Sequence, residues 1–235
     1  MPETVTVQVG EETMGIYISK PAGEARGAVV VLQEAFGVNE HIRDISDRLA
    51  EAGYVAAAPH LFHRTGAPEL GYEDMSAVMP YIMKLAAEEL ELDLAATLEY
   101  LAGIGFEGKN VGVIGFCMGG SISFLAAATW ELGASASYYG GGIAQGRFGI
   151  APLAELATEL KTPWIGFFGD LDKSIPTEEV ETLRTATDAV EVDTEIVRYE
   201  DADHGFHCDV RSSYHEASSK DAWPRTLEFF AANIG

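Results

Sequence analysis

The sequence predicts an α/β fold: a mostly parallel sheet of seven or eight strands with helices on both faces. Short β-rich runs alternate along the chain with longer segments of helical spacing, which is the pattern of such folds. Residues 28–32 are continuously apolar, as strands buried on both faces are. The chain has 235 residues, 47% of them hydrophobic, which is enough for one substantial core, and no internal repeat or low-complexity linker divides it.

Eight runs are expected to be strands. A Gly-Glu-Glu turn separates the first two, which predicts a hairpin at one edge of the sheet. The third run has VVVL at its centre and suits a strand in the middle of the sheet. In chain order the expected strands span residues 4–9, 14–19, 28–32, 54–58, 111–114, 134–138, 164–168 and 194–199.

Helical segments separate most of these strands. Ile42, Ile45 and Leu49 have the spacing of one helix face, and Gly53 is placed to end that helix. Trp130 and Trp223 are expected to belong to the core. The expected helices span residues 41–52, 76–104 (one or two helices, broken near Pro80), 118–130, 177–187 and 223–233, whereas residues 59–73 and 140–149 are expected to be loops.

Composition and charge exclude several classes of function. Fifteen Lys and Arg residues against 37 Asp and Glu give a formal net charge of -22, which repels nucleic-acid phosphates and anionic membranes. We therefore expect neither partner, and no apolar run is long enough to span a bilayer. The N-terminal residues lack the pattern of a secretion signal, so a cytoplasmic location is expected. The protein is expected to be a monomer or a small homo-oligomer. Cys117 and Cys208 are then expected to be free thiols.

The stretch GFCMG, residues 115–119, has the pattern glycine, any residue, nucleophile, any residue, glycine. It follows an apolar run and precedes a helical segment, so Cys117 is expected at a tight strand-to-helix turn that raises its side chain. A helix N-terminus favours the reactive thiolate. The backbone N–H of Met118 would then face an oxyanion. The alternative is an ordinary buried cysteine in a glycine-rich turn.

A nucleophilic thiol needs a base, and the base needs an acid to orient it. His204 directly follows one expected strand, in the stretch DADHGFHCD, and is the candidate base. Asp170 and Asp172 directly follow another, and position alone leaves both open as the acid. All three residues come at carboxyl ends of strands, where an open α/β sheet presents its site. The spacing of His, Cys and Asp in DADHGFHCD fits no standard zinc pattern, so no metal site is expected.

Nearly the whole chain resembles the dienelactone hydrolase family, which are cysteine-dependent members of the α/β-hydrolase superfamily. The resemblance implies a single α/β-hydrolase domain over residues 1–235, acting on small esters or lactones without a metal or organic cofactor. The family acid is the Asp of D-x-x-[VI]-P, which corresponds to Asp172, and the family histidine corresponds to His204. The segments that carry the resemblance are QEAFG (33–37), PHLFHR (59–64), GFCMGG (115–120), YYG (138–140), GDLDKSIP (169–176) and DADHGF (201–206).

The resemblance also implies a catalytic role for Glu34, whose carboxylate would help to generate the thiolate of Cys117. Ala35 would supply the second N–H of the oxyanion site, from the loop that follows the expected strand at 28–32. A turn cap or a solvated acid is the alternative reading of Glu34 in so acidic a chain. The remaining residues expected to bind substrate are Phe36, Arg64, Tyr139 and His207.

This chain departs from the family at the arginines that hold the carboxylate of a dienelactone. One is expected about four positions after the catalytic histidine, where Cys208 stands. Another is expected before the nucleophile, where residues 71–92 contain only Lys84 as a basic residue. Lysine does not replace the planar fork of arginine. We therefore expect a neutral or differently shaped ester or lactone as the substrate, hydrolysed through an acyl-enzyme. The rival hypothesis is a non-catalytic ligand-binding protein or thiol redox sensor on the same fold.

Overall fold

The computed structural model describes residues 2–235 and contains one eight-stranded sheet with the order β1-β2-β4-β3-β5-β6-β7-β8. β1 and β2 form the expected hairpin at the edge, and β2 also pairs antiparallel with β4. All other neighbours are parallel, which confirms the predicted fold class. The strands are β1 (Glu3–Val9), β2 (Glu12–Ser19), β3 (Gly27–Leu32), β4 (Tyr54–Pro59), β5 (Val111–Phe116), β6 (Ala134–Tyr138), β7 (Trp164–Gly169) and β8 (Thr194–Tyr199).

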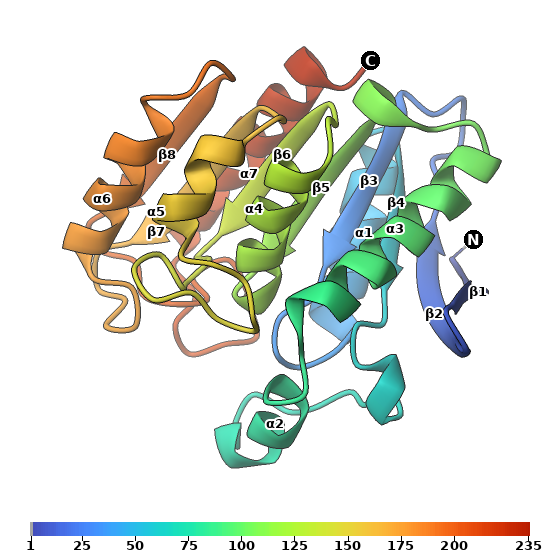
Figure 1. Cartoon of the computed structure of the whole chain (residues 1–235), viewed down its shortest axis with the longest axis horizontal. Helices are drawn as coiled ribbons and strands as arrows, with labels where there is room; N and C mark the ends of the chain where they lie inside the picture. The colour runs from blue at the N-terminus through green and yellow to red at the C-terminus, as the bar shows by residue number, and fades with distance from the viewer. Residues whose placement is uncertain (1) are drawn as a thin grey trace.

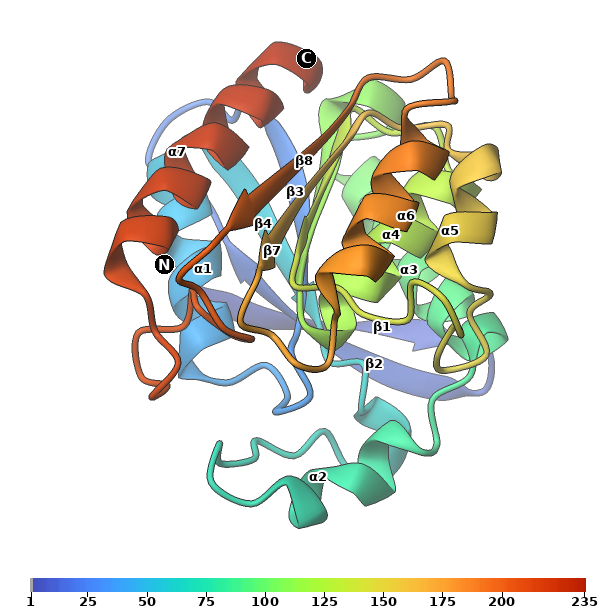
Figure 2. The same ribbon diagram turned by 90° about the vertical axis from the view of Figure 1, so that its left-hand side faces the viewer.

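Helices cover both faces of this sheet, as Figures 1 and 2 show. One face carries α1 (Glu40–Glu51) and α7 (Glu216–Asn233). The other carries α3 (Ala87–Gly103), α4 (Met118–Thr129), α5 (Leu153–Leu156) and α6 (Thr177–Thr187). Three short 3-10 turns lie in the connections between these elements: His63–Thr65, Gly108–Asn110 and Ala157–Glu159. Among the described residues, none of these helices is both long and apolar enough to cross a membrane.

The helix α2 (Met75–Ile82) lies apart from the three layers, at the bottom of the view in Figure 1. Three methionines in and just after this helix are exposed. The exposed fraction of the side chain is 49% for Met75, 44% for Met79 and 77% for Met83. Exposed thioethers in such a group are typical of a surface that contacts an apolar ligand.

The core follows from the layering. Every residue of β3, β4, β5, β6 and β7 is buried, because helices cover both sides of these strands. Trp164 lies within this core. The two other tryptophans, Trp130 and Trp223, are only partly buried and pack against its margin.

One helix boundary was wrongly predicted, and it involves a proline. α7 starts at Glu216 with Pro224 in its interior, and not at Trp223. The expected break near Pro80 is confirmed, because α2 contains Pro80 and ends at Ile82, and α3 begins at Ala87. A proline within a helix leaves the carbonyl four residues earlier without its N–H partner. Here those carbonyls belong to the exposed residues Ser76 and Lys220, where water can donate the missing hydrogen bond. The short helix α5, in a segment without clear periodicity, was not predicted.

Candidate active site

Cys117 forms the turn between β5 and α4 and has a positive φ of 54°. An L-residue rarely adopts this conformation, and its cost is met by the contacts around it. The Cys117 N–H donates to the Tyr138 carbonyl oxygen at 3.0 Å, and the Gly119 N–H donates to that of Gln33 at 3.1 Å. A Cβ on Gly115 would collide with the carbonyl of Gly119, and one on Gly119 would collide with Leu32. The two glycines are therefore required by the close approach of the turn to itself and to β3.

Asp172 and His204 lie together beside this cysteine. The loop after β7 carries Asp172 and the loop after β8 carries His204, and Asp172 Oδ2 is 2.5 Å from His204 Nδ1. The other oxygen, Oδ1, accepts from the backbone N–H of Ser174 at 2.8 Å and from its hydroxyl at 2.6 Å. Both oxygens of this buried carboxylate are thus fixed. Asp170, the other candidate acid, pairs instead with Arg198 through two hydrogen bonds of 2.8 and 2.7 Å.

The charges of this group support one another. Burial lowers the pKa of His204, but the neighbouring Cys117 and the hydrogen bond to Asp172 outweigh it and raise that pKa to about 10. Burial raises the pKa of Asp172, but the hydrogen bonds from His204 and Ser174 outweigh it, and the net shift is downward. These shifts favour an imidazolium at His204 next to an ionised carboxylate at Asp172.

A cavity of about 430 Å³ opens onto the sulfur. Ala35, Cys117 and Met118 line it together, so the two residues expected to supply oxyanion N–H groups lie with Cys117. The N–H of Met118 belongs to the first turn of α4, where helix N–H groups have no carbonyl partner within the helix. The rest of the lining comes largely from the α2 region and from the loop after β6: Met75, Met79, Ile82, Met83, Leu85, Arg147 and Phe148.

Glu34 is fully buried, and it is paired with an arginine that the sequence analysis did not consider. Arg211 Nη1 donates to Glu34 Oε1 at 3.1 Å, while Oε2 has no hydrogen-bond partner among the described residues. The guanidinium also lies 5.7 Å from the ring centroids of both Phe36 and Tyr72. In this structure, therefore, the contact partner of Glu34 is Arg211, and its action on Cys117 stays a prediction.

The four residues expected to bind substrate fall in different places. Phe36 is buried against Tyr72, with ring centroids 4.5 Å apart, and Tyr139 lies 5.1 Å from the His204 ring with its hydroxyl unpaired. Both therefore border the site. Arg64 does not line the cavity at Cys117: its two Nη atoms each lie 2.9 Å from a carboxylate oxygen of buried Asp93.

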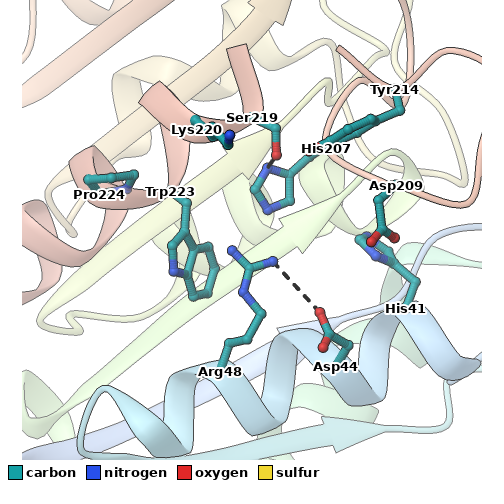
Figure 3. A pocket seen from close by; sticks show the side chains of 10 residues that line it. All are labelled: His41, Asp44, Arg48, His207, Asp209, Tyr214, Ser219, Lys220, Trp223 and Pro224. Atoms are coloured by element: carbon teal, nitrogen blue, oxygen red, sulfur yellow. Dashed lines mark hydrogen bonds and ion pairs between the residues drawn. The ribbon is translucent and has the colours of Figure 1, made fainter. Parts of the chain in front are cut away.

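His207 is also placed away from Cys117. It is buried on the side of the sheet covered by α1 and α7, its Nδ1 is 3.0 Å from Ser219 Oγ, and it lines a different cavity (Figure 3). Burial lowers the pKa of His207 well below its usual value. Gly205, with a φ of 79°, turns the chain between His204 and His207. That turn sends two histidines only three positions apart to separate sites.

Sequence reasoning missed two arginines and a group of methionines. Arg147 lies in the loop after β6 and lines the cavity, and Arg211 reaches Glu34 from the loop after β8. No local pattern marks either arginine, because each acts through a contact with a distant part of the chain. Met75, Met79 and Met83 recur at four-residue spacing, which is the one signal that could have found the methionines.

Comparison with known proteins shows the family to which the chain belongs. Residues 14–234 match the model of the dienelactone hydrolase family. A Salmonella typhimurium protein provisionally named carboxymethylenebutenolidase is 38% identical over 224 residues, covering 94% of this chain and 83% of that protein. A Synechocystis protein with the same provisional name is 36% identical over 241 residues, covering 99% and 98%. The crystal structure of a provisionally named dienelactone hydrolase from Klebsiella pneumoniae superposes with a TM-score of 0.90, at 37% identity and 98% coverage of both chains.

Proposed function

The chain belongs to the dienelactone hydrolase family and is an ester or lactone hydrolase, and on that premise we propose that Cys117 is its nucleophile, working through an acyl-enzyme. The single observation that carries the proposal is the position of His204. Its Nδ1 is bound to Asp172, its ring interacts with Cys117, and the sulfur opens onto a cavity. A buried structural cysteine needs none of these contacts.

The reaction begins when the Cys117 sulfur attacks the substrate carbonyl and an S–C bond forms. The electron pair of the carbonyl moves to its oxygen, and the N–H groups of Met118 and Ala35 stabilise the resulting oxyanion. Collapse of this intermediate breaks the C–O bond, and the leaving alkoxide takes a proton from the His204 imidazolium. An acyl-thioester on Cys117 remains.

Water completes the cycle. Neutral His204 takes a proton from a water molecule as its oxygen attacks the thioester, and the oxyanion forms again at the same two N–H groups. Breaking the C–S bond releases the acid and restores the thiolate beside protonated His204. Asp172 keeps Nδ1 protonated throughout, so that Nε2 is the nitrogen that exchanges protons with the substrate and water.

The lining of the cavity supports a substrate with a substantial apolar part. Methionines and other apolar side chains of the α2 region face Cys117 across about 430 Å³, and among residues 2–235 Arg147 is the one cation in the lining. Arg211, the other arginine near the site, is already paired with Glu34. An ester or lactone with an apolar acyl group therefore fits this lining better than a compact anionic dienelactone does.

The test is hydrolysis of p-nitrophenyl esters of increasing acyl length, together with a dienelactone, by the protein and by Cys117→Ala. We expect Cys117→Ala to abolish turnover and His204→Ala to accumulate an acyl adduct on Cys117, seen by mass spectrometry. Cys208→Ser is the matched control, because it removes the other thiol. Turnover that survives in Cys117→Ala would show that another group is the nucleophile.

The same experiment separates the enzyme from a thiol redox sensor. A sensor would react quickly with alkylating or oxidising reagents at Cys117 but show no steady-state hydrolysis of any ester in the series. A preference for the dienelactone over all the apolar esters would contradict the substrate class while leaving the nucleophile intact.

A further inference from the structure

Three side chains of metal-binding types meet next to the active site. Glu34, His41 and Cys208 each offer one ligand atom, and these atoms all lie within 4.8 Å of one another. The three residues come from the loop after β3, from α1 and from the loop after β8. Glu34 and Cys208 are fully buried and His41 is 6% exposed. Buried carboxylate, imidazole and thiol groups rarely gather without a bonding reason.

Two of these side chains have an atom with no bonding partner. Among the described residues, Oε2 of Glu34 and Nε2 of His41 are buried and accept or donate no hydrogen bond. Arg211 occupies only Oε1 of Glu34. The hydroxyl of Tyr72 lies 3.4 Å from the Cys208 sulfur, which is a weak contact for a thiol. The cluster therefore has a free carboxylate oxygen, a free imidazole nitrogen and a loosely held sulfur.

We propose that Glu34, His41 and Cys208 form a binding site for one divalent transition-metal ion, with Zn²⁺ as the ion that best matches the donor set. Zn²⁺ takes thiolate sulfur, imidazole nitrogen and carboxylate oxygen at about 2.0–2.3 Å. Ligands at those distances are roughly 3.5 Å apart in a tetrahedron, so the three side chains must move together by about 1 Å. A water molecule or the Tyr72 hydroxyl completes four-coordination.

The bonds and charges of binding can be stated. The metal–sulfur bond forms as the Cys208 thiol loses its proton to solvent, while His41 binds as the neutral imidazole. Two negative ligands and the Arg211 guanidinium leave the loaded cluster with one net positive charge. The chain as a whole carries a formal charge of -22, which favours uptake of a cation.

One member of the cluster adjoins a cavity. His41 lines the cavity of about 390 Å³ between α1 and α7 that Figure 3 shows, so an ion would reach the cluster on the side of this histidine. Asp209 and Lys220 also line this cavity, and Asp44 is paired there with Arg48 at 3.7 Å, so the charges of the lining are balanced. The route is separate from the substrate cavity at Cys117.

This site differs from the sequence-based expectation of no metal. That expectation considered only DADHGFHCD, whose Cys208 is one ligand here, whereas the other two ligands lie more than 160 residues earlier in the chain. The proposed ion takes no part in the reaction described above. It would hold Glu34 away from Cys117, so inhibition of hydrolysis by Zn²⁺ is a consequence that rests on the proposed function.

Direct binding of Co²⁺ tests the site without any use of activity. Cys117→Ala serves as the starting protein, because it removes the other thiol, and it is treated with a chelator and then titrated with Co²⁺. We expect one ion per chain, a sulfur-to-cobalt charge-transfer band in the near ultraviolet, and displacement by Zn²⁺. In the same background His41→Gln and Glu34→Gln should each weaken binding at least about tenfold, and Cys208→Ser should remove the sulfur band.

His207→Gln is the matched control. His207 is a second buried histidine of the same cavity, with its ring centroid 6.4 Å from that of His41, but it is not one of the three ligands. We expect this variant to bind Co²⁺ as tightly as its parent. Sub-stoichiometric binding, a spectrum without the sulfur band, or equal weakening by His207→Gln and His41→Gln would each overturn the proposal. Circular dichroism shows which variants are folded, and the two conservative Gln variants keep the test available if Cys208→Ser does not fold.

Discussion

Replacing Gly119 by alanine tests the idea that close backbone contact builds the turn at Cys117. The added Cβ would lie 2.6 Å from the Leu32 carbonyl carbon and 2.7 Å from the Gln33 oxygen, and closer still to the Leu32 oxygen. All three are backbone atoms of β3 or the residue after it, so no side-chain rotation relieves the contact. The N-terminus of α4 must move away from β3 by roughly 1 Å to restore van der Waals distances.

The expected cost has two parts. Overpacking of a buried site costs about 1–3 kcal/mol, and the movement breaks the hydrogen bond of 3.1 Å from the Gly119 N–H to Gln33, which adds about 1–3 kcal/mol. We therefore expect a loss of about 4 kcal/mol in the free energy of unfolding. Because Met118 moves with the helix while Ala35 stays with β3, kcat/KM for an active ester should also fall about 100-fold.

Urea unfolding and ester hydrolysis measure the two effects. The matched control is Gly103→Ala, at the last residue of α3, where nothing lies within 4 Å of an added Cβ. This variant should be as stable and as active as the original protein. If Gly119→Ala were within about 0.5 kcal/mol of Gly103→Ala in unfolding free energy and kept its kcat/KM, the close-contact explanation of the turn would be wrong.

Three further outcomes follow from the charges at the site. Asp172→Asn should lower kcat on the order of 10³-fold with the fold intact, because the Nδ1 proton of His204 is no longer fixed; an unchanged kcat would contradict this. Arg211→Gln should cost about 2 kcal/mol in urea unfolding by leaving the Glu34 carboxylate buried and unpaired, and adding Glu34→Gln should recover most of that loss; a double variant no more stable than the single one would argue against the ion pair. The pKa of His204 is raised to about 10 from 6.5, so protonation of the folded protein contributes stability that is fully present below pH 6.5 and is lost as the pH rises toward 10. Unfolding free energies measured across that range should decline, and less steeply in His204→Gln; equal slopes would refute the assignment.

The parts of the site that could be read from the sequence are those that follow strands directly. Cys117 and His204 could be predicted to lie together because each comes at the carboxyl end of a strand, and the sheet fixes where such residues meet. The choice of Asp172 over Asp170 required the family resemblance, since both follow β7. Structure gives the physical reason: Arg198 of β8 takes both oxygens of Asp170, so that carboxylate is already paired.

The parts that could not be read depend on contacts between distant segments. Arg64 looked available to a substrate, but Asp93 lies 29 residues later on α3 and takes its guanidinium. Arg211 was overlooked because it comes seven positions after His204 and meets Glu34 across 177 residues of sequence. The spacing of apolar residues indicates which face of a helix or strand is buried. It does not indicate which two charged side chains from distant segments will form an ion pair.

The fold itself was largely readable because its strands are short, apolar and separated by glycine or proline. β6, β8 and α6 have the predicted bounds, and the other strands differ by only one or two residues at an end. The main error fell at Pro224, which lies in the interior of α7, where the carbonyl four residues earlier belongs to the exposed residue Lys220. A sequence pattern cannot show whether water reaches that carbonyl.

The separation of α2 from the three layers has a consequence for how such enzymes diversify. Its methionines form one wall of the cavity, while Val78 is the buried residue of the helix and packs with Ala35 and Phe36. Exchanges on the exposed side of this helix can reshape the entrance to the sulfur without touching the layers that cover the sheet. New substrate preferences are therefore accessible here by changes that the rest of the molecule tolerates.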